Sequence, residues 1–78
     1  MPYDAKLDQC LVSKQWEGEM SRIVVSIFAY NQGQKKLQIS RENKTPEGEY
    51  RFTKLGRMTK DEAKAILPLM QELLPQME

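Results

Sequence analysis

The spacing of apolar residues changes once along this chain, from alternation before residue 58 to helical spacing after residue 62. In residues 35–42, Leu37 and Ile39 alternate with polar side chains, which is typical of a strand with one buried face. Residues 22–30, RIVVSIFAY, are rich in β-branched and aromatic side chains and too short for a typical helix. Because apolar residues then recur at helical spacing over residues 63–77, strands followed by one helix are expected.

Glycines mark the turns between the expected strands. Residues 31–34, NQGQ, are expected to form a turn in which Gly33 takes a positive φ, and Pro46 with Gly48 marks the next turn. Short strands joined by such turns predict an antiparallel meander. The expected strands are residues 9–16, 22–30, 35–42 and 49–55. The fold class is therefore α+β: a four-stranded antiparallel curved sheet over residues 9–56, then a C-terminal helix over residues 60–76 (ββββα). Residues 9–78 form a single domain after a flexible N-terminus, residues 1–8.

The helix has a defined start and a predicted interruption. Thr59 and Glu62 fit a capping box, in which each side chain accepts a hydrogen bond from the backbone N–H of the other residue. Pro68 cannot donate a backbone hydrogen bond, so a kink or break is expected near residues 64–67.

Alternation assigns side chains to the two faces of the sheet. The aliphatic row of the second strand, which includes Val25 and Ile27, is expected to meet the helix. In the fourth strand, Tyr50 and Phe52 suit the core, which places Arg51 and Thr53 on the open face. Two aromatic residues, Phe28 and Tyr30, would share that open face with polar residues of the third strand. These polar residues are Lys36, Gln38 and Ser40.

Composition narrows the class of function. With a single cysteine and no histidine among 78 residues, an intrachain disulfide and the usual zinc spacings are excluded. No arrangement of catalytic residues stands out, so we expect no enzymatic activity, no cofactor and no metal. The sequence contains neither a membrane-length apolar run nor a secretory signal, and a cytoplasmic location is expected, nucleoid-associated if the protein is bacterial.

The charge is unevenly distributed, although the net charge is only +1. Residues 20–60 carry nine bases against three acids, whereas both ends of the chain are acidic. Aromatic rings among bases suit single-stranded nucleic acid, because bases stack on rings while Lys and Arg follow the phosphates. The open face and the basic cluster give these candidate binding residues: Phe28, Tyr30, Lys35, Lys36, Gln38 and Arg51.

The runs VSIFAYNQGQKKLQI and RENKTPEGEYRFTKLGRMTKDEA resemble the conserved domain of the positive-cofactor-four transcriptional coactivators and their short bacterial and phage relatives. The resemblance implies a whirly-like homodimer, paired through its helices, that holds single-stranded DNA or melted duplex. It implies a stacking role for Tyr30 and adds Lys54 and Arg57 to the binding residues. On the helix, the implied dimer contacts are Ile66, Met70, Leu73, Leu74 and Met77.

The leading hypothesis is thus a dimeric, non-enzymatic single-stranded-DNA-binding protein with a role in transcription, replication or repair. Two alternatives stay open. Phe28 and Tyr30 could pack against a partner chain in a protein-interaction module, with the bases serving solubility. RNA is the third option, since only contacts to the 2′-hydroxyl separate it from DNA.

Overall fold

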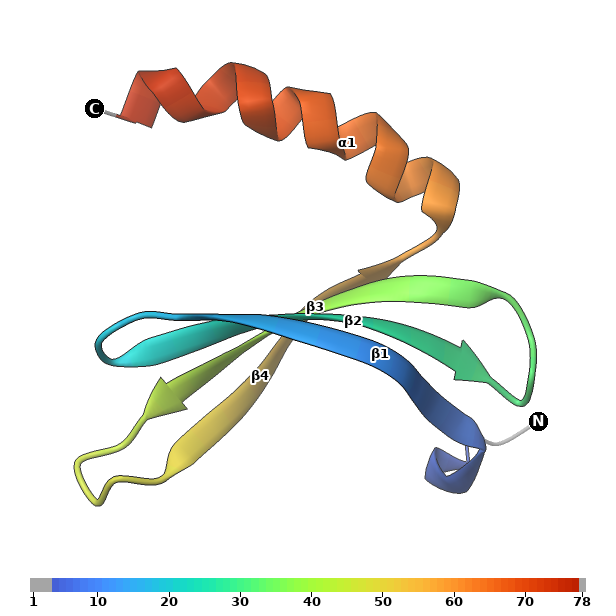
Figure 1. Ribbon diagram of the computed structural model, residues 1–78, viewed down its shortest axis with the longest axis horizontal. Helices are drawn as coiled ribbons and strands as arrows, with labels where there is room; N and C mark the ends of the chain where they lie inside the picture. Colours follow the sequence, from blue (N-terminus) through green and yellow to red (C-terminus); the bar gives the residue numbers. More distant parts are fainter. Residues whose placement is uncertain (1–3, 78) are drawn as a thin grey trace.

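The computed structural model describes residues 4–77, and its strands pair in chain order to form one antiparallel sheet (Figure 1). The predicted ββββα fold is confirmed. Each strand covers nine or ten residues, so several extend beyond their predicted ends. The elements are η1 (Ala5–Leu7), β1 (Asp8–Glu17), β2 (Ser21–Tyr30), β3 (Lys35–Lys44), β4 (Tyr50–Met58), α1 (Lys60–Leu73) and η2 (Leu74–Met77).

The segment before the sheet makes specific contacts where it is described. Residues 1–3 of the expected flexible N-terminus lie outside the described residues, and β1 begins at Asp8, one residue earlier than predicted. The backbone N–H of Asp4 donates to the Tyr30 hydroxyl at 2.7 Å, and that of Asn31 donates to the Leu7 carbonyl at 2.7 Å. The 3₁₀ turn η1 is therefore tied to the end of β2.

The turn between β2 and β3 differs from the sequence prediction in one respect. Asn31 and Gln32 have φ values of 51° and 59°, whereas Gly33 does not take a positive φ. Positive φ at both central residues is the type I′ pattern, which matches the twist of a hairpin. Gly33 is needed for space instead, because a Cβ there would lie 2.9 Å from the carbonyl oxygen of Tyr30.

Two bulges set which side chains share a face. The register of β1 against β2 shifts between Cys10 and Val12, which leaves Leu11 as the extra residue. The register of β3 against β4 shifts between Ile39 and Ser40, which makes Leu55 the extra residue in β4. A bulge reverses the alternation of the strand beyond it, so both strands change phase partway along their length.

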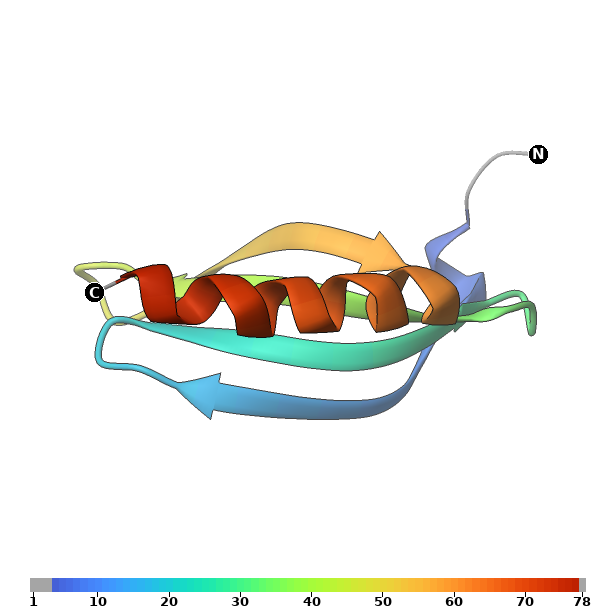
Figure 2. The ribbon, with the colours of Figure 1, turned by 90° about the horizontal axis from the view of Figure 1, so that it is seen from above.

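Helix α1 runs lengthwise over the middle strands of the sheet (Figure 2). The capping box is confirmed: Thr59 accepts from the Glu62 N–H at 3.2 Å, and Glu62 accepts from the Thr59 N–H at 2.8 Å. The helix runs from Lys60 to Leu73 through Pro68, so of the predicted kink or break the break does not occur. Within residues 4–77, no helix is both long and apolar enough to cross a membrane.

The layer between helix and sheet is open. Ala29 is the one buried hydrophobic residue within residues 4–77. The strands diverge from α1 toward its C-terminal end (Figure 1), and Met70 and Leu73 are more than half exposed. The radius of gyration is 14.8 Å, against about 11.5 Å for a compact domain of this length. The chain by itself therefore leaves much of its apolar surface uncovered.

Candidate nucleic-acid interface

The sheet surface opposite α1, here called the far face, carries most of the polar contacts between strands. Its position follows from the register, because residues paired across strands lie on the same face. Ser26 of β2, for example, faces Ser13 and Gln38, and its hydroxyl lies 3.1 Å from that of Ser13. Besides these three residues, the far face carries Asp8, Cys10, Gln15, Glu17, Arg22, Val24, Phe28, Tyr30, Lys36, Ser40, Glu42, Lys44, Tyr50, Phe52, Lys54 and Arg57.

Arg57 of β4 contacts the other three strands at one end of the far face. Its guanidinium donates to both carboxylate oxygens of Asp8 at 2.9 Å and twice to Oε1 of Gln38, at 3.0 and 2.7 Å. The same group lies over the Phe28 ring, 4.5 Å from its centroid. Because four hydrogen bonds hold the guanidinium, it is fixed in position over the Phe28 ring.

A depression opens beside this cluster, with a volume of about 230 Å³, lined by Phe28, Tyr30, Gln34, Lys36 and Arg57. Phe28 and Tyr30 are half-buried, and Lys36 at the rim is exposed. The Tyr30 hydroxyl is held by Asp4, as described above, so the ring is fixed in orientation. The depression thus combines two aromatic rings with an exposed cation.

A second cluster lies toward the β3–β4 hairpin. The Arg22 guanidinium packs over the Tyr50 ring, 3.9 Å from its centroid, and donates a hydrogen bond to Glu42. An oxygen of the Glu17 carboxylate lies 3.6 Å from a terminal nitrogen of the same guanidinium. The hydrogen bond to Glu42 raises the pKa of Arg22 above its ordinary value, so the guanidinium stays charged at any working pH.

The charges of the far face separate into paired and unpaired groups. The carboxylates of the four strands are Asp8, Glu17 and Glu42, and each forms an ion pair with Arg57 or Arg22. Three lysines on the same face form no ion pair within residues 4–77: Lys36, Lys44 and Lys54. The arginines therefore neutralise the acids, and the lysines carry the positive excess.

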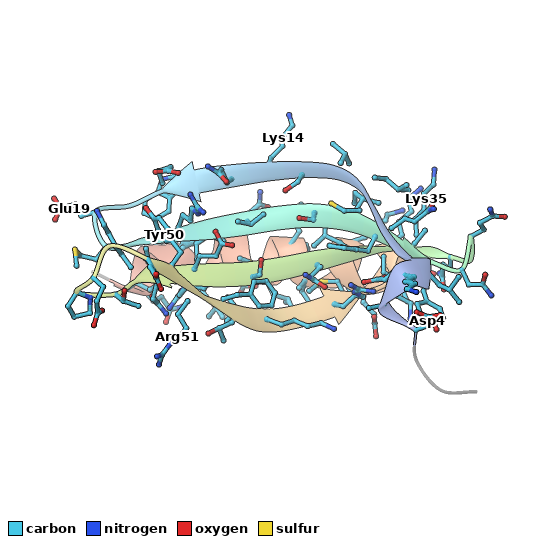
Figure 3. All side chains as sticks on the ribbon, turned by 90° about the horizontal axis from the view of Figure 1, so that it is seen from below. Asp4, Lys14, Glu19, Lys35, Tyr50 and Arg51 are labelled. Atoms are coloured by element: carbon cyan, nitrogen blue, oxygen red, sulfur yellow. The ribbon has the colours of Figure 1, made fainter. Side chains whose placement is uncertain are left out.

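The structure places most predicted binding residues on the far face: Phe28, Tyr30, Lys36, Gln38, Lys54 and Arg57. Gln38 is buried and serves as an acceptor for Arg57. Lys35, a candidate from the basic cluster, pairs with Ala29 on the helix side and lines an apolar groove beneath α1. The prediction that Arg51 and Thr53 lie on the open face is wrong. Arg51 pairs with Asn43 and Thr53 with Arg41, both on the helix side, and Arg51 extends away from the hairpin end of β4 (Figure 3).

The prediction that Tyr50 and Phe52 lie in the core is also wrong. Tyr50 is 41% exposed and Phe52 57% exposed, and their partners Lys44 and Glu42 place both on the far face. The bulge at Leu55 is the cause, since Met58 pairs with Leu37 on the helix side. Unbroken alternation from Met58 would have brought the two rings to the helix side as well.

Sequence reasoning missed three far-face residues: Lys44, Tyr50 and Phe52. For Tyr50 and Phe52 the signal was the bulge, and Gly56 beside Leu55 was its only local mark, since glycine within a strand is common at bulges. Lys44 lies two residues beyond the predicted end of the third strand, and continuing the alternation of Lys36 and Gln38 would have placed it on the far face. Comparisons of this chain with protein-family models, with curated proteins and with solved structures find no match.

Proposed function

We propose that this protein binds single-stranded DNA on the far face, as a non-enzymatic homodimer. One observation supports the binding proposal above all others. The far face carries aromatic rings and three lysines that form no ion pair within residues 4–77. On the same face, each carboxylate of the strands is already paired with an arginine. Base stacking on a protein ring contributes about 1–3 kcal/mol per base and tolerates any sequence. The lysines add the attraction for phosphates that depends on salt.

The exposed rings of the far face favour single strands over duplex. A duplex hides the faces of its bases, so the rings of the far face could reach only its backbone. Duplex readers more often insert a helix into the major groove. Here α1 lies on the opposite side of the sheet, and its first turn carries Asp61 and Glu62, which repel phosphates.

The homodimer proposal rests on the uncovered apolar layer. Leu67, Met70 and Leu73 of α1 are 52–58% exposed, and the groove beneath the helix adds Leu11 and Val12 of β1. Burying the exposed half of such a side chain stabilises by roughly 1 kcal/mol. A second copy brings the same apolar stripe and can cover several such residues at once, which a 78-residue chain without disulfides needs.

The binding proposal is tested by fluorescence anisotropy with labelled dT12 and a duplex of equal length, at two salt concentrations. We expect tighter binding to dT12 and a steep loss of affinity with salt. Lys36→Ala should lower the slope of log K against log salt by about 0.7, the share of one phosphate contact in a single strand. Arg41→Ala is the matched control, because Arg41 lies on the same strand but faces the helix side.

Equal affinity for single and double strands, or no binding at low salt, would reject the proposal.

The second candidate, a protein-interaction module, is favoured by the exposed apolar side chains of α1. It predicts a monomer that binds no oligonucleotide. Sedimentation of the purified chain distinguishes that monomer from the proposed dimer. Parallel titrations with dT12 and U12 test RNA as an alternative ligand.

A further inference from the structure

Phe52 is a large apolar side chain that the fold leaves mostly exposed. It lies on the far face in the hairpin half of β4, is 57% exposed, and faces Glu42 across the β3–β4 pair. Tyr50, two residues before it on the same face, is 41% exposed, and an exposed aromatic patch among polar residues is typical of an interaction site. The opposite side of the same strand carries only Arg51 and Thr53 at this level.

The surroundings of Phe52 suit a polyanion. Lys54 lies two residues after Phe52 on the far face of β4, and Lys44 lies on β3 opposite Tyr50. Neither lysine forms an ion pair within residues 4–77. Glu42, the nearest carboxylate in the register, is bound by Arg22. Tyr50 is covered on one side by the same Arg22 guanidinium. Phe52 is therefore the open ring of this cluster, with lysines flanking it.

We propose that Phe52 is the centre of a second base-stacking platform, flanked by Lys44 and Lys54, distinct from the depression at Phe28 and Tyr30. This inference rests on the proposed function. The two platforms lie six residues apart along β3, since Lys36 pairs with Phe28 and Glu42 with Phe52. At ~3.3 Å per residue this separation is about 20 Å. A single DNA strand that engages both platforms must therefore run along β3 over the far face.

The span sets the length of DNA that the far face requires. At the duplex rise of 3.4 Å per nucleotide, about six nucleotides cover 20 Å, and an extended strand needs fewer. A 12-nucleotide strand is long enough to reach both platforms of one chain. The platform at Phe52 thus adds binding energy to the same strand that the first platform holds.

Two sets of variants test the platform on dT12. Phe52→Ala and Phe52→Leu remove the ring, and Leu keeps most of the apolar surface. Each should weaken binding about fivefold or more, the lower limit for loss of one stacked base. Lys54→Ala should weaken binding and lower the salt slope. Its matched control, Arg51→Ala, removes an exposed cation from the other face of β4 and should stay within twofold.

A spectroscopic readout separates stacking from an indirect effect on folding. In a Trp16→Phe background, which removes the single tryptophan, Phe52→Trp places an indole at the platform and Thr53→Trp places one on the opposite face. Addition of dT12 should quench the first and leave the second unchanged. If the unaltered protein binds dT12 but Phe52→Ala and Phe52→Leu bind equally well and no quenching appears, the second platform is rejected and the proposed function stands. If the unaltered protein does not bind dT12, both are rejected.

Discussion

The ion pair between Asp8 and Arg57 should be the strongest single polar contact in the sheet. It joins β1 to β4 across the two middle strands through two hydrogen bonds of 2.9 Å, with side chains only 10% and 19% exposed. Removing one partner of a buried pair costs about 3–5 kcal/mol, because the remaining charge stays buried. Since both side chains keep some exposure, we expect about 2–4 kcal/mol for either Asp8→Ala or Arg57→Ala.

A double-mutant cycle measures this pair. Removing both residues leaves no unpaired charge, so the double variant should be about 2 kcal/mol more stable than the sum of the two losses predicts. The assay is urea unfolding followed by far-UV circular dichroism at one fixed protein concentration, because a dimer makes stability depend on concentration. The control cycle uses Glu17 and Arg22, which are 3.6 Å apart and more exposed, and should couple by less than ~1 kcal/mol. If the stability losses of the two single variants sum to that of the double variant within ~0.5 kcal/mol, the two residues are not coupled and the reasoning is refuted.

Three other expectations concern the turn, the cap and the interface. Gly48 has φ of 88°, and a Cβ added there would meet no atom within 4 Å. Gly48→Ala should therefore lower the free energy of unfolding in urea by about 1 kcal/mol through backbone strain alone. An unchanged unfolding midpoint would contradict this. Thr59→Ala removes the cap of α1 and should cost ~1 kcal/mol, whereas Thr59→Ser should cost little; equal losses in the two variants would argue against capping. Leu73→Arg puts a charge into the proposed interface, where Leu73 is 58% exposed, and should convert the dimer to a monomer in sedimentation; an unchanged sedimentation coefficient would place the interface elsewhere.

Local chemistry was enough to predict the order and type of the elements. The β-branched content of residues 22–30 and the alternation around Leu37 and Ile39 depend only on neighbouring residues, and both segments are strands. The capping box at Thr59 is equally local, since its two side chains bind each other's backbone within one turn. Of the kink or break expected near Pro68, the break does not occur, because loss of one hydrogen bond does not end a helix whose other turns are intact.

Part of the candidate site could also be predicted this way. Phe28, Tyr30 and Lys36 alternate with residues of the helix side, so their common face followed from strand periodicity alone. The role of Arg57 could not, because its partner Asp8 is 49 residues away in the chain. Nor could the sequence indicate that Arg22 would neutralise both Glu17 and Glu42 and leave the lysines to set the charge of the face.

The sequence by itself determined a ββββα chain with a basic, aromatic middle, because strand and helix periods, turns and caps are set by residues close together in the chain. Only the tertiary structure decided which face Tyr50, Arg51 and Phe52 occupy. Apolar character argued for a buried Phe52, but the bulge at Leu55 shifts the alternation by one residue, and such a shift turns every side chain to the other face. That shift depends on how β4 pairs with β3, which no pattern within β4 contains.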